Sequence, residues 1–363
     1  MSDPVYNFGA GPAMLPVPVM QQIREEFLDF NHMGVSVIEI SHRSKEFEAV
    51  LARCDDLMRE IGAIGAAHEI LYMHGGAQMQ FAAVPMNLLA MKPARKAVYS
   101  ETGNFSRLAN QEAARYGDIV IASSSKESHY DHLPPLTRSM LPDDASYAFI
   151  TSNNTIYGTQ YRQYPDLGDI PLVVDATSDI YSRPVDFSKI GIMFGGLQKN
   201  LGVSGTAVVV VRKDLIGHAM ERTPSLLDYA VNQKNHSMPN TINTFAIYAM
   251  TLVLQWIKDG GGLAAMALRN EEKAAVIYDT IDSLDFYRGT AQKQDRSLMN
   301  VTFVLPSEEL TVKFLRLALD NGLYALKGHR LVGGVRASIY NPMPIEGCRK
   351  LAEFMKEFAR TNG

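Results

Sequence analysis

The stretch from residue 173 to residue 202, VVDATSDIYSRPVDFSKIGIMFGGLQKNLG, is the part of this 363-residue chain from which the fold can be inferred. It begins with an apolar run that ends on Asp175, and after a second apolar run at 190–194 it closes on GGLQKN, which contains Lys199. A short apolar run bounded by polar residues is typical of a buried strand. In an open α/β sheet, ligands bind outside the carboxyl ends of the strands. We therefore expect Asp175 and Lys199 to face one cleft from neighbouring strands.

A carboxylate and a lysine in this arrangement suit the cofactor pyridoxal phosphate (PLP). An acid keeps the pyridine nitrogen of PLP protonated, and a lysine amine forms an imine with its aldehyde. Simpler interpretations stay open for this stretch taken alone. An aspartate at a strand end often only caps the next turn, and Gly-Gly-x-x-Lys is often a surface turn.

The composition indicates an ordinary globular chain, long enough for two domains. Apolar residues make up 46% and charged residues 20%, and the net charge of −4 is spread along the chain, so nothing indicates a nucleic-acid partner or a membrane surface. Two cysteines provide no framework for disulfides or for a metal site, and we expect a cytoplasmic protein. The N-terminus has neither a basic start nor a long apolar run, so we expect no signal peptide, and no apolar run approaches the ~18 residues of a membrane-spanning helix.

Strand and helix patterns alternate along the first 260 residues. The expected strands lie at 70–73, 97–99, 119–121, 147–150, 172–174, 190–194 and 206–211, and the expected helices lie at 17–30, 47–61, 78–91, 102–116 and 243–258. This alternation predicts an α/β fold with a mainly parallel, doubly wound sheet.

The glycine run at 260–262 marks a candidate domain boundary. We expect an N-terminal arm at 1–16, a large domain at 17–260 and a smaller α/β domain at 261–363. The small domain has helix patterns at 263–284, 308–321 and from 344 onward, and strand patterns at 299–305, near 324 and at 335–340.

Polar groups recur at the expected strand ends. The turn that contains Gly75, Gly76 and Ala77 has the strand–turn–helix form that binds phosphate through free backbone N–H groups. Phe105 can stack on a flat ring, Thr155 can bond a ring hydroxyl or a phosphate, and Ser178 can donate to a phosphate. Each residue alone also has an ordinary explanation, as a core aromatic, a helix cap or a turn residue. Their joint placement at successive strand ends favours one binding site.

Nearly the whole chain resembles the phosphoserine aminotransferases, a family in the class V branch of the fold-type-I PLP-dependent transferases. The resemblance is carried by motifs that include NFGAGP at 7–12, SHRS at 41–44, GGA at 75–77, NTI at 154–156, DATS at 175–178, QKN at 198–200, NT at 240–241 and GHRLVGGVRAS at 328–338. The last motif is the most specific of these, because it differs from the other class V enzymes.

The resemblance implies roles for the residues at these positions. Lys199 forms the imine with PLP and Asp175 protonates the ring nitrogen. Phe105 stands where the family usually has a stacking tryptophan, which is a departure from the family pattern. The resemblance further implies a homodimer with shared active sites, in which Asn240 and Thr241 reach the phosphate of the partner's cofactor. The remaining residues implied to line the cofactor are Gly76, Ala77, Thr155, Ser178 and Gln198.

The family's substrates carry a negative group at each end, and arginine suits both carboxylate and phosphate. Arg336 resembles the residue that binds the α-carboxylate. In the family, a further set of residues binds the substrate's distal negative group, and some of them come from the partner subunit. The residues here that resemble this set are His42, Arg43, His329 and Arg330. Surface arginines and histidines near turns are commonly only solvated, so these roles rest on the resemblance.

The function implied is transamination of 3-phosphohydroxypyruvate with L-glutamate, which gives O-phospho-L-serine and 2-oxoglutarate. The phosphohydroxythreonine step of vitamin B6 synthesis is a further expectation. The first alternative is a class V aminotransferase for small unphosphorylated acids. A desulfurase would need a nucleophilic cysteine on a mobile loop, and neither Cys54 nor Cys348 is well placed for that. A non-catalytic nucleotide-binding protein would leave Lys199 without a role.

Overall fold

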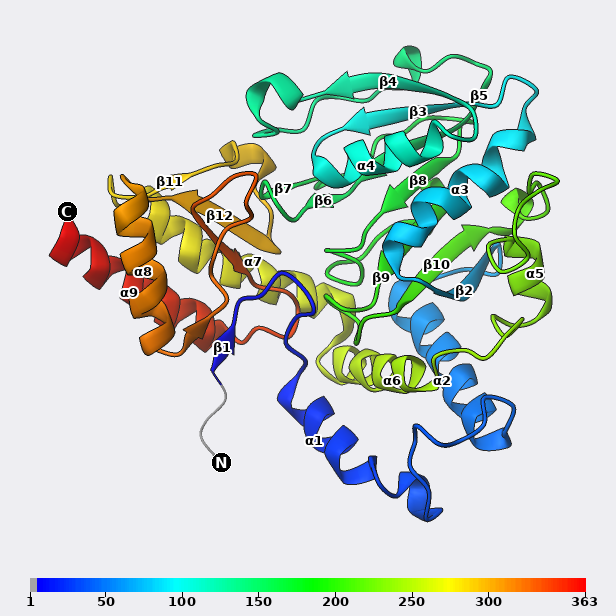
Figure 1. Ribbon diagram of the computed structural model, residues 1–363, viewed down its shortest axis with the longest axis horizontal. Coiled ribbons are helices and arrows are strands. Elements are labelled where there is room, and N and C mark those ends of the chain that lie inside the picture. The colour runs from blue at the N-terminus through cyan, green and yellow to red at the C-terminus, as the bar shows by residue number, and fades with distance from the viewer. Residues whose placement is uncertain (1–4) are drawn as a thin grey trace.

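The fold is built around a seven-stranded sheet, seen in a computed structural model that describes residues 5–363 (Figure 1). The strand order is β2-β10-β9-β8-β5-β3-β4, and every neighbouring pair is parallel except the two pairs made by β10. The strands of this sheet are β2 (His68–His74), β3 (Lys96–Glu101), β4 (Asp118–Ser124), β5 (Ala145–Thr151), β8 (Leu172–Asp175), β9 (Ile192–Gly196) and β10 (Thr206–Arg212).

Apart from the edge strand β4, which has no buried residue, the strands are apolar because both faces of the sheet are covered. In β10, Val208 and Val210 pack into the core on one face, while Val209 and Val211 pack into the core on the other face. Successive side chains of a strand point to opposite faces, so a strand buried on both faces is a continuous apolar run. This explains why the strands could be recognised as short apolar runs in the sequence.

Helices cover the two faces of the sheet. The helices α2 (Lys45–Gly62), α6 (Thr244–Asp259) and the start of α7 (Gly262–Asp282) pack on one face, and α3 (Gln80–Leu88), α4 (Asn104–Ala113) and α5 (Tyr229–Lys234) pack on the other. The boundaries of α2 have local causes. The Ser44 side chain accepts a hydrogen bond from the Phe47 N–H at the start, and the helix stops where Ala63 adopts a left-handed conformation.

The C-terminal part of the chain forms a second core (Figure 1). It contains the antiparallel sheet β11-β12-β14, the end of α7, and two further helices. The N-terminal arm joins this core, because β1 pairs with β13 and Phe8 is fully buried there. The elements are β1 (Tyr6–Asn7), β11 (Arg288–Gly289), β12 (Asn300–Val304), β13 (Leu323–Tyr324), β14 (Val335–Ser338), α8 (Glu308–Asp320) and α9 (Ile345–Asn362).

The element boundaries differ from the sequence prediction in a few places. The helix expected at 17–30 is α1 (Val17–Glu26), and it ends early because the chain folds back on itself there. Ser36 Oγ donates to the Phe27 carbonyl and the Phe30 N–H donates to the Val35 carbonyl at 2.9 Å. The short helix α5 and the hairpin of β6 (Asn153–Asn154) and β7 (Thr159–Gln160) were not predicted.

The separate cores support the proposed division into 17–260 and 261–363, which stays a prediction. The first four residues of the proposed arm at 1–16 lie outside the described residues. Within residues 5–363 no helix is long and apolar enough to span a membrane.

Candidate active site

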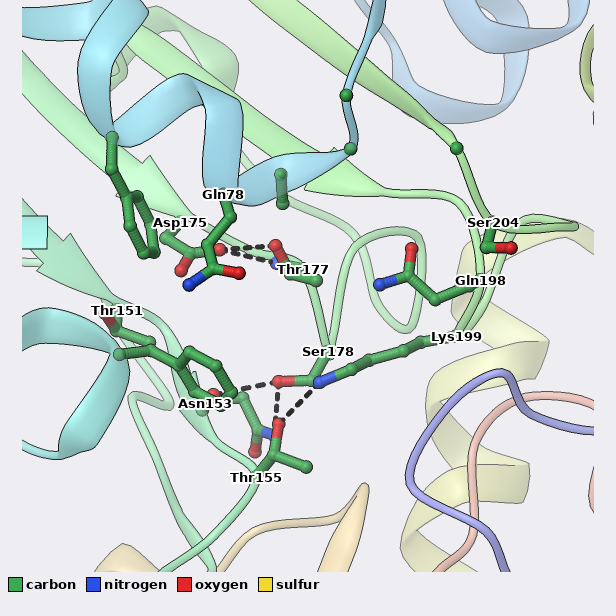
Figure 2. Close-up of a pocket in the computed structure, with 16 residues that line it drawn as sticks. Gln78, Thr151, Asn153, Thr155, Asp175, Thr177, Ser178, Gln198, Lys199 and Ser204 are labelled. Atoms are coloured by element: carbon green, nitrogen blue, oxygen red, sulfur yellow. Dashed lines mark hydrogen bonds between the residues drawn. The ribbon is translucent and has the colours of Figure 1, made fainter. Parts of the chain in front are cut away.

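A cavity of about 240 Å³ opens at the carboxyl edge of the large sheet (Figure 2). The segments that follow β2, β3, β5, β8 and β9 all contribute to its wall, and so does the segment before the antiparallel β10. Because parallel strands end at the same edge, residues far apart in sequence meet there. Eight predicted site residues line this cavity: Gly76, Ala77, Phe105, Thr155, Asp175, Ser178, Gln198 and Lys199.

Lys199 crosses the cavity from the turn after β9. Its side chain is buried, and Nζ donates to Thr155 Oγ1 at 2.7 Å. The amine lies 5.7 Å from the centroid of the Phe105 ring and 6.0 Å from the centroid of the Tyr340 ring. Gly11 lies against its stem, since a Cβ at Gly11 would be 3.3 Å from Lys199 Cγ. The amine is therefore held in one position by packing and by a single hydroxyl.

Asp175 is the last residue of β8, and the neighbouring strand β9 leads to Lys199. Its Oδ1 accepts from the Thr177 N–H at 3.0 Å and from the Thr177 hydroxyl at 2.6 Å. Both bonds use one oxygen, so Oδ2 stays available to a ligand (Figure 2). Burial raises the pKa of this carboxyl, although the Thr177 bonds and the Lys199 charge act in the opposite direction.

The glycine turn after β2 provides backbone donors. Gly76 has a φ of +67°, and a Cβ built on it would meet nothing within 4 Å, so the backbone is open to a ligand there. The N–H groups of Gly76 and Ala77 take no part in the backbone–backbone hydrogen bonds of residues 5–363. They lie at the start of the helical segment that leads into α3, where an anion is favoured.

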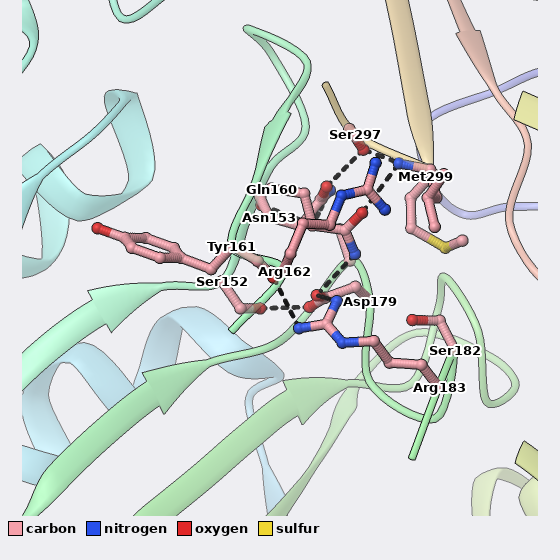
Figure 3. Close-up of polar contacts among 12 residues, drawn as sticks. Ser152, Asn153, Gln160, Tyr161, Arg162, Asp179, Ser182, Arg183, Ser297 and Met299 are labelled. Atoms are coloured by element: carbon pink, nitrogen blue, oxygen red, sulfur yellow. Dashed lines mark hydrogen bonds and ion pairs between the residues drawn. The ribbon is translucent and has the colours of Figure 1, made fainter. Parts of the chain in front are cut away.

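A buried polar network connects this cavity to the second core (Figure 3). The Asn153 amide donates to Ser178 Oγ at 2.8 Å and to Asn300 Oδ1 at 2.7 Å, and it accepts from Ser297 Oγ at 2.5 Å. The Ser178 hydroxyl also bonds the Asn153 carbonyl at 2.8 Å. One side chain thus links a residue of the cavity to the segment that leads into β12.

The carboxylate of Asp179 fixes the loop after β8 through hydrogen bonds to neighbouring side chains. Its carboxylate accepts from Ser152 Oγ, from Gln160 Nε2 at 3.0 Å and from Arg183 Nη1 at 3.5 Å. The Gln160 side chain in turn accepts from the Leu298 N–H at 2.9 Å. The loop that carries Asp175 and Ser178 is therefore fixed to both halves of the molecule.

Seven predicted site residues do not line the cavity, and four of these lie in the first 260 residues: His42, Arg43, Asn240 and Thr241. Arg43, Asn240 and Thr241 are exposed, while His42 is half-buried and its Nε2 is buried without a hydrogen-bond partner among residues 5–363. The single chain thus does not bring these residues to the cavity, and their roles stay predictions.

The remaining three, His329, Arg330 and Arg336, lie on or beside a tight loop. The Gly328 N–H donates to the Gly334 carbonyl at 3.0 Å, and a Cβ at Gly328 would lie 1.9 Å from the Gly333 carbonyl oxygen, so only glycine fits. Burial, then the charges of Arg336 and Arg330, lower the pKa of His329. The two guanidinium groups therefore act on this imidazole. Arg336 Nε is buried and has no partner in the described part of the chain.

Sequence reasoning missed several residues of the cavity. Thr177 could have been found, because an acceptor on Asp175 and a donor two residues later form a common turn. Gln78, Thr151, Asn153 and Ser204 also line the cavity but had no sequence signal that distinguished them from loop residues. Tyr340 directly follows Ile339 of the second core, and its proximity to Lys199 depends on how the two halves pack.

Comparisons with known proteins agree with this geometry. The sequence model of the family "Aminotransferase class-V" matches residues 5–351. The phosphoserine aminotransferase of Geobacillus kaustophilus is 48% identical over 356 residues, which is 98% of both chains. The structure of phosphoserine aminotransferase from Bacillus circulans subsp. alkalophilus superposes with a TM-score of 0.96 at 43% identity over all of both chains. The PLP-bound phosphoserine aminotransferase of Trichomonas vaginalis gives a TM-score of 0.92 at 34% identity, covering 97% of this chain and 99% of that one.

The raised pKa of Asp175 predicts a stability effect in the protein without cofactor. The folded protein holds the Asp175 proton more tightly than the unfolded chain, so ionisation destabilises the fold as the pH rises above the ordinary value of 3.8. Asp175→Asn keeps the Oδ1 acceptor for Thr177 and removes the charge. We expect the cofactor-free variant to melt about 1–3 °C higher than wild type at pH 7, and the difference to disappear toward pH ~4.

Asp186 provides the matched control for this experiment. Its Oδ1 accepts from the Ser188 N–H and hydroxyl in the same way, but the side chain is exposed and these bonds lower its pKa. Asp186→Asn should therefore leave the melting temperature at pH 7 unchanged or lower it. A cofactor-free Asp175→Asn protein that is less stable than wild type at pH 7 would show that the Asp175 charge stabilises the fold.

Proposed function

The chain belongs to the class-V aminotransferase family and, within it, to the phosphoserine aminotransferases, and from this premise we propose that it transaminates 3-phosphohydroxypyruvate with L-glutamate. The products are O-phospho-L-serine and 2-oxoglutarate, and the cofactor is PLP. One observation of the site carries the proposal: a buried lysine and a buried carboxylate from neighbouring strands share one cavity.

The residues of the cavity fit PLP. Asp175 presents an unused carboxylate oxygen where a ring nitrogen would need a charge partner. The N–H groups of Gly76 and Ala77 suit the phosphate, and the Phe105 ring offers an aromatic face in place of the family's tryptophan. Lys199 is the lysine of this cavity, and Thr155, Ser178 and Gln198 complete the set proposed to hold the cofactor.

The chain's own groups then have defined tasks. When bound, PLP supplies an electron-withdrawing ring that takes up the electrons of the breaking Cα–H bond. Lys199 Nζ accepts the proton from Cα of the amino donor and returns a proton to Cα of the product in the second half-reaction. Asp175 Oδ2 holds the proton on the ring nitrogen. Thr155 Oγ1, which accepts from Lys199 in the structure, orients this amine.

The substrate's negative groups explain the unpaired cations around the site. Arg336 is proposed to bind the α-carboxylate, since its Nε is buried without a partner in residues 5–363 and a carboxylate would accept two of its bonds. His329 and Arg330 are proposed to bind the distal phosphate or carboxylate. Burial and then the charges of Arg336 and Arg330 lower the pKa of His329, and a phosphate beside these groups would offset the contribution of the two charges.

We propose that the active site is shared between two copies of the chain. Asn240 and Thr241 are the residues expected from the partner, and we propose that His42 and Arg43 come from it as well, since none of the four lines the cavity of its own chain. The segment that leads to His42 exposes large apolar side chains, among them Leu28 at 79% and Ile38 at 52% exposure, which a second copy would cover.

The structure also bears on the alternative functions that the sequence left open. Burial raises the pKa of both the Cys54 and the Cys348 thiol to about 12, and both cysteines are buried, so neither fits the nucleophile of a desulfurase. A class V aminotransferase for small unphosphorylated acids remains the alternative. The vitamin B6 step and a cytoplasmic location are proposals that depend on substrate tests and on localisation in cells.

The first test of the proposed function is Lys199→Ala. With the proton acceptor removed, transamination of phosphoserine should fall by on the order of 10²–10⁴-fold or more, and the visible band of lysine-linked cofactor should be absent. Borohydride reduction of the wild type followed by peptide mapping should label Lys199, and the exposed Lys189 serves as the control substitution. Labelling of another lysine in the wild type would end this assignment.

The second test concerns phosphate selectivity. Arg43→Gln or Arg330→Gln should lower kcat/KM for phosphoserine about 10- to 100-fold, because a charge-assisted bond is lost, and should change kcat/KM for alanine far less. Arg336→Gln should lower kcat/KM for phosphoserine, glutamate and alanine together. The exposed Arg349 of α9 is the control. Equal losses for phosphoserine and alanine in Arg43→Gln would show that Arg43 does not bind the phosphate, and a wild type that prefers alanine would favour the alternative function.

The third test concerns the shared site. Lys199→Ala is mixed with the double variant Asn240→Ala and Thr241→Ala under conditions in which subunits exchange. In each mixed dimer one site has an intact Lys199 and intact partner residues, so random exchange should restore about a quarter of the wild-type sites. Absence of recovery after exchange is demonstrated would mean that each site is built from one chain.

A further inference from the structure

Lys273, on α7, is a buried lysine that the proposed mechanism does not use. Its side chain is 3% exposed, and Nζ donates to the carbonyls of Ile339, Tyr340 and Asn341 at 3.1, 2.7 and 3.4 Å. No ion pair joins Lys273 to a carboxylate within residues 5–363, and burial lowers the pKa of Lys273 to about 7. Burying an amine that has only carbonyl partners costs free energy. We therefore ask what its three hydrogen bonds do for the segment that they reach.

The segment it binds, 339–341, directly follows β14 and forms part of the site's surroundings. Tyr340 places its ring 6.0 Å from Lys199 Nζ. Its hydroxyl donates to the Ala10 carbonyl at 2.9 Å and accepts from the Asn300 amide at 3.2 Å. Tyr340 is thus fixed at its backbone by Lys273 and at its ring end by the N-terminal arm.

Asn341 connects the same segment to the turn that carries Lys199. Its backbone N–H donates to Asn200 Oδ1 at 3.0 Å, and its side-chain amide donates to the Tyr181 carbonyl at 2.8 Å. Asn270, three residues before Lys273 on the same face of α7, donates to Asn341 Oδ1 at 2.9 Å and to the Ser182 carbonyl at 3.0 Å. One helix face therefore holds the end of β14 against the segments that follow β8 and β9.

We propose that Lys273 is a positioning residue for transamination, which fixes 339–341 so that β14 and its Arg336 stay in register with Lys199. This inference rests on the proposed function, in which Arg336 binds the α-carboxylate and Lys199 takes the Cα proton. The two groups come from different cores and must hold one small molecule between them. A displacement of about 1 Å between such groups costs on the order of 10²-fold in rate.

The experiment uses Lys273→Met, which keeps the unbranched stem of the side chain, one atom shorter, and removes the amine donors. The control is Thr280→Val, on the same helix and equally buried, whose hydroxyl donates within residues 5–363 only to the Val276 carbonyl of its own helix. The first readout is amide hydrogen exchange of the cofactor-free protein in peptides covering 336–342 and 196–201. The second is kcat and KM of the cofactor-loaded enzyme for phosphoserine, glutamate and alanine.

We expect exchange to become faster in both peptides of Lys273→Met, by about tenfold or more, and kcat to fall for all three donors by on the order of 10–10²-fold. Thr280→Val should change neither readout. The proposal is overturned if exchange at 196–201 and kcat both stay within about twofold of wild type while the protein folds, because Lys273 then serves stability alone.

Asn341→Ala provides the second variant if Lys273→Met does not fold. It keeps Lys273 and removes the side-chain bonds to Tyr181 and Asn270, so exchange at 196–201 should again become faster and kcat should fall. No change in either readout would overturn the proposal. The exchange measurement needs neither cofactor nor substrate, so coupling between the two segments is tested even if phosphoserine proves not to be the substrate.

Discussion

Two buried charged groups, kept in one cavity without neutralising each other, are the constraint on which this structure depends. Lys199 donates to the Thr155 hydroxyl and Asp175 accepts from Thr177, so each charge has a neutral partner. Burying such groups is costly, and the well-packed sheet beneath them offsets that cost. The arrangement leaves room between them for a ligand that needs a charge partner at one end and an amine at the other.

The sheet makes this arrangement possible because of how its strands are directed. Strands β8 and β9 are parallel neighbours, so their carboxyl ends deliver Asp175 and Lys199 to the same edge. The antiparallel β10 brings its beginning to that edge instead, which adds Ser204 and Gly205 to the wall of the cavity. The site is thus a consequence of strand direction, and the loops only complete it.

The second core controls how the site is closed. It reaches the cavity through the Asn153 network (Figure 3), through the tyrosine at 340 and through the N-terminal arm, in which Gly11 packs against Lys199. The helix α7 belongs to both cores, since Met266 packs in the first and Ile277 in the second. Any displacement of one half against the other therefore changes the surroundings of Lys199. The buried polar side chains of α7 matter because they hold the two halves in place.

The sequence by itself determined the class of fold and the central pair of the site, because both depend on local patterns. A strand buried on both faces is an apolar run, and the residues that end it, such as Asp175, are visible as the point where polarity returns. Of the eight predicted site residues that line the cavity, seven were indicated by such strand-end patterns, and Gln198 came from the family resemblance. The family resemblance supplied the remaining assignments, which local patterns could not.

Only the tertiary structure decided which distant groups meet. Nothing near Tyr340 or Asn153 in sequence reveals that one lies beside Lys199 and the other connects two cores, since those contacts depend on how two separately packed units fit together. The same holds for Lys273, whose helical pattern gives no sign that its three donors end on consecutive carbonyls. Sequence patterns indicate which segments are buried away from water. The pairing of buried polar groups depends instead on geometry that forms only when the chain has folded.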